Sequence, residues 1–163
     1  MLFRSGIDTV YAAMNNIWVW LARNPDRRRE MIATPENIDA QLEELLRIYG
    51  VTFSGRELIK DYEMHGVQMK AGERIFCMLP ACNYDPDVFP NPREVRFDRP
   101  RGTILTFTGG IHACMGAHLA RLEMKIALQE WLRRIPDFEI RSGAEIRYAP
   151  SGVIGPVAVP LVW

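Results

Sequence analysis

The segment Phe107-Thr108-Gly109-Gly110-Ile111-His112-Ala113-Cys114-Met115-Gly116 is the most informative stretch of this chain. Its two adjacent glycines permit a tight turn with positive φ, and Cys114 then precedes an amphipathic stretch, 116–135, that we expect to be helical. Free N–H groups and the positive dipole end at a helix N-terminus favour a thiolate. Gly116 removes side-chain bulk where a flat ligand could lie. The pattern therefore predicts a loop that presents the Cys114 thiolate.

Spacing alone leaves two other interpretations of this cysteine open. A lone cysteine is most often a small, buried apolar residue. A zinc site is also conceivable from His112, Cys114 and His118, because Cys114 and His118 are four residues apart. This set lacks a further ligand at short spacing, which counts against zinc.

The composition is that of a globular domain. The chain has 163 residues, of which 48% are hydrophobic, and its 20 basic residues balance 20 acidic ones. This balance argues against nucleic-acid binding through bulk positive charge, and no apolar run approaches the ~18 residues of a membrane span. Three cysteines without framework spacing, and no signal peptide, predict a reducing, cytoplasmic location.

Hydrophobic periodicity predicts a mainly α fold with small β sheets, an α+β class. The first helix, 6–23, is apolar around nearly its whole circumference, so we expect it in the middle of a larger structure. The other expected elements are a helix at 39–49, strands at 58–62, 67–69 and 74–78 with turns at 65–66 and 71–72, the helix at 116–135, and β hairpins from 138 onward.

The cysteine segment resembles the haem-thiolate signature of the cytochrome P-450 family: Phe, two variable residues, Gly, three variable residues, Cys, one variable residue, Gly. The Leu-Ala-Arg run at 119–121 is also common in that family. The resemblance implies that Cys114 is the proximal ligand of the iron of haem b (iron protoporphyrin IX), with Phe107, Gly110 and Gly116 shaping its loop. It also implies that His112 contacts a haem propionate.

Arg56 matches a second propionate contact of the family. Ser54 stands where camphor-hydroxylase-like bacterial members have Asp, so their propionate network differs here in part. The resemblance is nevertheless closest to these bacterial members, through residues 134–138 and 159–163. It implies that Thr52, Val153 and Ile154 line the substrate pocket.

A glutamate and an arginine, Glu44 and Arg47, are about one helical turn apart and share a helix face. On spacing alone they can be an ordinary surface ion pair worth ~0–1 kcal/mol. The pair resembles the family's buried Glu-x-x-Arg pair. Arg96, in Arg96-Phe97-Asp98, matches the arginine that completes this structural set.

Gly6-Ile7-Asp8-Thr9 resembles the acid–alcohol pair of the family's long central helix. The resemblance implies that Asp8 and Thr9 are catalytic and deliver protons during dioxygen activation. In a purely structural alternative, Thr9 bonds back to the preceding turn and Asp8 caps the helix.

The resemblance covers residues 6–163, which match the C-terminal part of a family domain more than twice as long. Residues 1–5 offer no convincing helix start, and Leu-Phe-Arg-Ser at 2–5 is one reading frame of a common sequencing adapter. We therefore expect 1–5 to be a non-native scar preceding a partial haem-thiolate domain.

In the intact enzyme, the resemblance implies a haem-dependent monooxygenase that hydroxylates a small hydrophobic substrate with O2 and two electrons. The electrons would come from a 2Fe-2S ferredoxin and its reductase, with Arg121 and Lys125 facing the docking side. The alternative is a truncated, catalytically inactive fragment without its own stable haem site, in which Trp18 and Trp20 would be exposed.

Overall fold

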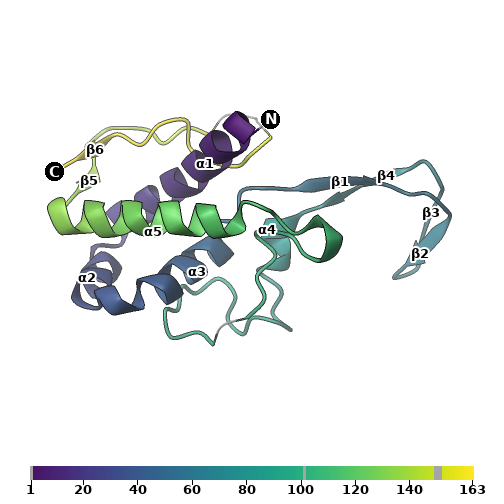
Figure 1. Ribbon diagram of the computed structural model, residues 1–163, viewed down its shortest axis with the longest axis horizontal. Helices are drawn as coiled ribbons and strands as arrows, with labels where there is room; N and C mark the ends of the chain where they lie inside the picture. Colours follow the sequence, from purple (N-terminus) through teal and green to yellow (C-terminus); the bar gives the residue numbers. More distant parts are fainter. Residues whose placement is uncertain (1, 101, 149–151) are drawn as a thin grey trace.

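Three helices, α1 (Leu2–Arg23), α3 (Ile38–Ile48) and α5 (Ala117–Arg134), form the body of the molecule, and α5 contacts both of the others (Figure 1). This computed structural model describes residues 2–100, 102–148 and 152–163, and within α1 the side chains from residue 7 onward. Figure 1 shows that α1 and α5 run in broadly the same direction, with their N-terminal ends toward the same end of the body.

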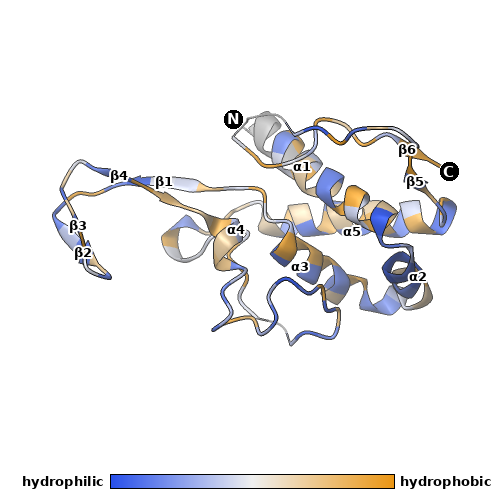
Figure 2. Cartoon of the chain, turned by 180° about the vertical axis from the view of Figure 1, so that it is seen from behind, coloured by the Kyte–Doolittle hydropathy of each residue, from blue (hydrophilic) through white to orange (hydrophobic). Residues whose placement is uncertain are grey.

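Short helices connect these elements. After α1, the chain forms α2 (Pro25–Ala33), which is hydrophilic along most of its length in Figure 2, and the one-turn η1 (Pro35–Asn37). The remaining short elements are α4 (Leu79–Cys82) and η2 (Gly110–His112). Proline is at or near the first position of α2, η1 and α4, where its missing N–H is not needed.

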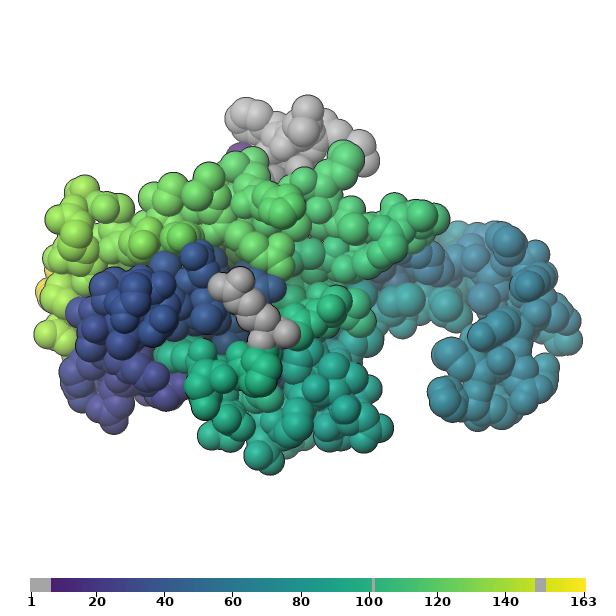
Figure 3. Space-filling view, turned by 60° about the horizontal axis from the view of Figure 1, so that its bottom comes forward, coloured from purple at the N-terminus to yellow at the C-terminus, as the bar shows by residue number. Residues whose placement is uncertain are grey.

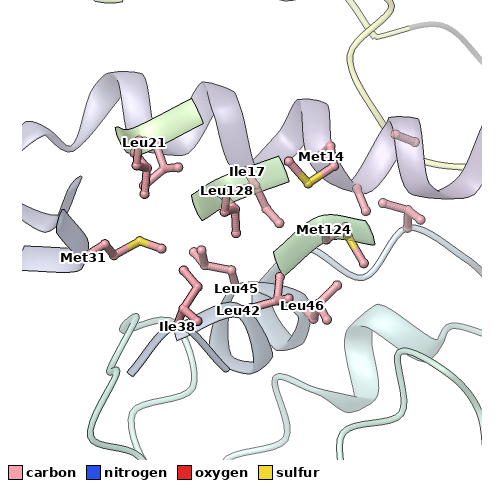
Figure 4. Packing of buried hydrophobic residues seen from close by; sticks show 14 of the residues in the cluster. Met14, Ile17, Leu21, Met31, Ile38, Leu42, Leu45, Leu46, Met124 and Leu128 are labelled. Carbon is pink, nitrogen blue, oxygen red and sulfur yellow. The ribbon is translucent and has the colours of Figure 1, made fainter. Parts of the chain in front are cut away.

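The core lies where the three long helices meet (Figure 4). Apolar residues on α3 recur at the spacing that puts them on one face, and that face turns inward. Their counterparts on α5 are buried in the same way, so both helices form within one residue of the predicted bounds. The buried side chains labelled in Figure 4 are Met14, Ile17, Leu21, Met31, Ile38, Leu42, Leu45, Leu46, Met124 and Leu128.

The C-terminal segment covers part of α1. Asn15 and Asn16 of α1 donate their side-chain amides to the carbonyls of Pro156 and Ile154, at 3.1 and 2.8 Å. Gly155 lies so close to α1 that an added Cβ would be 2.7 Å from Cβ of Ala12. A glycine is therefore required where the segment crosses the helix.

The two α1 tryptophans are half-buried, in contrast to the exposure expected of an inactive fragment. Trp18 packs on Trp131, with 5.2 Å between ring centroids, and Trp20 meets Phe97 edge to face at 6.2 Å. The helix itself extends from Leu2 rather than from Gly6 as predicted. Met1 is outside the described residues, so the expected scar at 1–5 stays a prediction.

Two antiparallel strand pairs form an arm that projects from the helical body, as Figures 1 and 3 show. β1 (Ser54–Glu57) pairs with β4 (Arg74–Cys77), and β2 (Tyr62–Met64) pairs with β3 (Val67–Met69) at the tip. The turns at 65–66 and 71–72 form as predicted, with positive φ at His65, Gly66 and Gly72.

The predicted strand at 58–62 is wrong, because most of it is the link between β1 and β2. In place of the predicted series of C-terminal hairpins, the described residues form one short pair, β5 (Glu139–Ile140) with β6 (Leu161–Val162), and one bridge between Tyr148 and Pro156. The predicted mainly α fold with small sheets is confirmed. Within the described part of the chain, no helix is long and apolar enough to cross a membrane.

Candidate functional site

The loop before α5 is held by backbone hydrogen bonds that fix the position of Cys114. The Cys114 N–H donates to the carbonyl of Phe107 at 2.9 Å, and the Ala117 N–H that begins α5 donates to the Cys114 carbonyl at 3.2 Å. Gly110, at the turn, has a φ of 60°, which glycine adopts without the penalty that a side chain brings. The backbone therefore presents the cysteine at the start of the helix, as the sequence predicted.

The Cys114 thiol is exposed, and its neighbours in the loop are apolar and exposed as well. Ile111 and Met115 expose 97% and 98% of their surface. An added Cβ on Gly116 would lie 3.9 Å from Sγ of Cys114, so the glycine keeps one flank of the sulfur open. A thiol on an exposed apolar surface fits a flat, largely apolar group that would cover that surface.

The chemistry of the donor set also fits such a group. Among residues 2–100, 102–148 and 152–163, no group of three His, Cys, Asp or Glu side chains is placed to hold a metal ion. The zinc alternative from His112, Cys114 and His118 is therefore not supported. A single thiolate suits a metal whose other ligands come from a macrocycle, as in haem.

A buried ion pair joins Glu44 and Arg47 on α3. Arg47 donates from Nε and Nη2 to the two carboxylate oxygens of Glu44, both at 2.8 Å, and the side chains are only 1% and 4% exposed. The remaining donors of Arg47 reach the backbone carbonyls of Asn83, Pro92 and Glu94. The same-face pair predicted from the sequence is thus a fully bonded, buried clamp on the irregular segment after α4.

The third member of this set is Arg99, and the prediction of Arg96 is wrong. Arg99 donates from Nε to Glu44 at 3.2 Å with a side chain 8% exposed, whereas the side chain of Arg96 is 38% exposed and pairs with Asp98. Arg96 reaches Glu44 through its backbone N–H alone, at 3.0 Å. The Glu44 lock is defined here as Glu44, Arg47 and Arg99.

The predicted substrate residues lie close together beside α1. The Ile154 N–H donates to the carbonyl of Val51 at 2.8 Å, which joins the turn containing Val153 and Ile154 to the segment containing Thr52. The same turn crosses α1 at Ala12 through Gly155. Thr9, three residues before Ala12, is half-buried and Asp8 is exposed. The structure therefore places the predicted substrate and catalytic residues along one part of α1.

The two predicted propionate contacts lie on different elements. Arg56 is on β1, where its guanidinium donates to the Ser54 hydroxyl and, at 2.8 Å, to the Gly55 carbonyl. His112 is exposed at the end of η2, and its carbonyl accepts a hydrogen bond from the Thr108 hydroxyl. Ser54 thus supports Arg56 directly, a pairing that the sequence did not suggest.

The two cations expected to face a ferredoxin are bound by carboxylates of α3. Arg121 forms a bidentate pair with Glu43, at 2.8 and 2.7 Å, and Lys125 pairs with Asp39 at 2.9 Å. The hydrogen bond with Glu43 raises the pKa of Arg121. Because both charges are already matched within the chain, the arrangement does not support their role in attracting an acidic partner.

Comparison with known proteins agrees with the geometry. A family model described as Cytochrome P-450 matches residues 1–145. Among curated proteins, "Probable cytochrome P-450 127A1" of Sinorhizobium fredii is 36% identical over 159 residues, which are 98% of this chain and 38% of that protein. The steroid C26-monooxygenase of Mycolicibacterium smegmatis is 33% identical over 145 residues, 88% of this chain and 36% of that protein.

Among solved structures, that of cytochrome P-450 CYP101C1 has a TM-score of 0.94 and 34% sequence identity. The match covers 99% of this chain and 42% of the solved one. This chain therefore spans about two fifths of the length of the proteins to which it is similar.

Proposed function

The chain belongs to the cytochrome P-450 family, and on that premise we propose that it forms the cysteine-bearing part of a haem-dependent monooxygenase, with Cys114 as the ligand of the iron of haem b. The observation that carries this proposal is the exposed thiol at the start of α5, fixed by the Cys114 N–H bond to Phe107 and flanked by the exposed side chains of Ile111 and Met115. Haem, when bound, supplies the activation of dioxygen and the insertion of one oxygen atom into a C–H bond.

The chain's own residues have separable tasks in this proposal. Cys114 would hold the iron, and the exposed side chains of Ile111 and Met115 would pack against the bound group beside the sulfur. Asp8 and Thr9 provide a carboxyl and a hydroxyl group that can hold and pass a proton. His112 and Arg56 provide a polar ring and a guanidinium that suit the two propionate groups.

The substrate we propose is a small hydrophobic molecule. Thr52, Val153 and Ile154 combine two aliphatic side chains with one hydroxyl. The hydrogen bond between Ile154 and Val51 joins their two segments, and the Ile154 carbonyl accepts a hydrogen bond from Asn16 of α1. Such a surface favours an apolar ligand oriented by one polar contact.

We further propose a 2Fe-2S ferredoxin with its reductase as electron donor, and no nucleic-acid or membrane partner. A cytoplasmic location suits the three free cysteines.

Absorption spectroscopy of the reduced, CO-bound protein tests the iron ligand. The 163-residue chain is mixed with haem, reduced and exposed to CO, alongside Cys114→Ala and the control Cys82→Ala, which removes another exposed free thiol. We expect a strongly red-shifted Soret band in the wild type and in Cys82→Ala, and its loss in Cys114→Ala.

Either of two results would contradict the proposal. The shifted band could persist in Cys114→Ala, which would assign the iron to another ligand. The wild-type chain could bind no haem at all, which would support the alternative of an inactive fragment without its own haem site.

A further inference from the structure

Arg121 lies between the Cys114 loop and α3 and contacts both. Its guanidinium forms the bidentate pair with Glu43 and lies over the ring of Phe107, 4.3 Å from the ring centroid. We propose that Arg121 is a positioning residue that anchors the Cys114 loop to α3. The anchoring concerns the loop itself, and only its consequence for a bound iron rests on the proposed function.

The contacts form a continuous chain from α3 to the cysteine. Glu43 fixes the plane of the Arg121 guanidinium, because both carboxylate oxygens accept hydrogen bonds from it. That plane supports the ring of Phe107, whose carbonyl accepts the Cys114 N–H. A lysine at 121 would keep the charge but could not form the two-pronged pair or present a flat face to the ring.

The pair with Glu43 also keeps the Arg121 guanidinium charged, because the hydrogen bond with Glu43 raises the pKa of Arg121.

The chain contains a matched control for this arrangement. Lys125 of α5 pairs with Asp39 of α3, so this ion pair joins the same two helices. Lys125 comes four residues after Arg121, farther along α5 from the Cys114 loop, and Asp39 comes four residues before Glu43. The Lys125 and Arg121 side chains are similarly exposed. Removing Lys125 therefore removes one positive charge and one ion pair between α3 and α5 while leaving the support of Phe107 intact.

Amide hydrogen exchange of the full chain tests the anchoring without haem. The variants are Arg121→Gln, Arg121→Lys, Glu43→Gln and Lys125→Gln, with urea unfolding measured in parallel. We expect exchange at the Cys114 amide to rise about tenfold in both Arg121 variants, to rise less in Glu43→Gln, and to stay at the wild-type rate in Lys125→Gln.

Two outcomes would overturn the anchoring. In one, Lys125→Gln raises exchange in the loop as much as Arg121→Gln does, which would make the effect a general loosening of α3 against α5. In the other, the wild-type loop already exchanges as fast as the exposed tip formed by β2 and β3. Global destabilisation alone is recognised because it raises exchange in the core of α5 by the same factor.

Absorption spectroscopy of the haem-loaded chain tests what the anchoring does for the iron ligand. Arg121→Gln and Arg121→Lys should enlarge the fraction of the reduced, CO-bound protein that lacks the red-shifted band, and Lys125→Gln should leave that fraction at the wild-type value. Equal fractions in Arg121→Gln and Lys125→Gln would overturn this part. Failure of the wild type to bind haem would instead contradict the proposed function, and the exchange experiment would still decide the anchoring.

Discussion

The Glu44 lock and the Cys114 loop are both irregular segments packed beside a helix, yet they expose their functional groups to opposite extents. In the lock, one carboxylate and two guanidinium groups are almost entirely buried and bonded to one another and to backbone carbonyls. In the loop, the backbone is bonded but the thiol and its apolar neighbours are exposed. The lock is complete within the chain, whereas no residue that the structure describes covers the exposed surface of the Cys114 loop.

This difference indicates which partner each site requires. Buried charges are tolerated only when their partners are present, so the lock contains everything it needs and its contribution is to stability. Exposed apolar side chains gain free energy when a further surface covers them, at about 25 cal/mol per Å². On the proposed function, the exposed surface of the Cys114 loop is the one that a bound haem would cover.

The largest effect is expected from neutralising the carboxylate of the lock. Glu44→Gln leaves two buried guanidinium groups without their counter-charge, which typically costs about 3–5 kcal/mol of unfolding free energy. Urea unfolding followed by circular dichroism measures this loss. The control, Glu130→Gln, removes a carboxylate that pairs with Arg133 and Arg134 on the exposed face of α5 and should leave the unfolding midpoint unchanged. Equal midpoint shifts in the two variants would remove the distinction between lock and surface.

Only part of the Glu44 lock could be predicted from the sequence. The apolar period of α3 and the one-turn spacing of Glu44 and Arg47 are local, so both could be predicted. The choice of Arg99 over Arg96 could not, because the segment after α4 has no period and both arginines occur in it three residues apart. The path of the folded chain turns the Arg99 side chain toward Glu44, whereas Arg96 contacts Glu44 only through its backbone N–H.

The contact between the C-terminal segment and α1 could not be predicted from the sequence, for a related reason. The hydrogen bonds of Asn15 and Asn16 join residues 141 and 138 positions apart, and no local pattern signals such a pairing. The cysteine loop, by contrast, is contained within ten residues, and its glycines and the helix that follows define its shape locally. Its ion-paired support was still missed, because Glu43 is 78 positions from Arg121.

A smaller change in unfolding free energy should distinguish Arg99 from Arg96. Arg99→Gln removes a hydrogen bond to a buried charge, which should lower the unfolding free energy by about 1.5–3 kcal/mol. It also removes the guanidinium that donates to the backbone carbonyls of Pro90 and Glu94. Arg96→Gln should not change the unfolding free energy measurably, since the backbone N–H of residue 96 still donates to Glu44. Urea unfolding of both variants provides the measurement. A larger loss in the Arg96 variant would show that Arg96 completes the lock.

The smallest effect on the free chain is expected at the apolar tip of the cysteine loop. Met115→Ser should change the unfolding free energy of the haem-free chain by less than about 0.5 kcal/mol, because an exposed side chain has no packing to lose. Haem affinity should nevertheless fall about tenfold or more, since burying a methionine side chain is worth about 1.5–3 kcal/mol. Titration with haem, followed by absorbance, measures the affinity. Ile59→Ser, which removes an equally exposed apolar side chain on the arm, should leave it unchanged.

The contrast between the Cys114 loop and the Glu44 lock depends on the results for Met115→Ser and Ile59→Ser. If Met115→Ser destabilises the haem-free chain as a core substitution would, the tip is packed within this chain and the contrast with the Glu44 lock disappears. If Met115→Ser and Ile59→Ser lower haem affinity equally, exposed apolar surface in general, rather than the surface beside Cys114, attracts the ligand. A loss confined to Met115 would mean that the exposed surface is specific to the ligand bound at the sulfur, because the two variants differ in where the apolar side chain lies and not in how exposed it is.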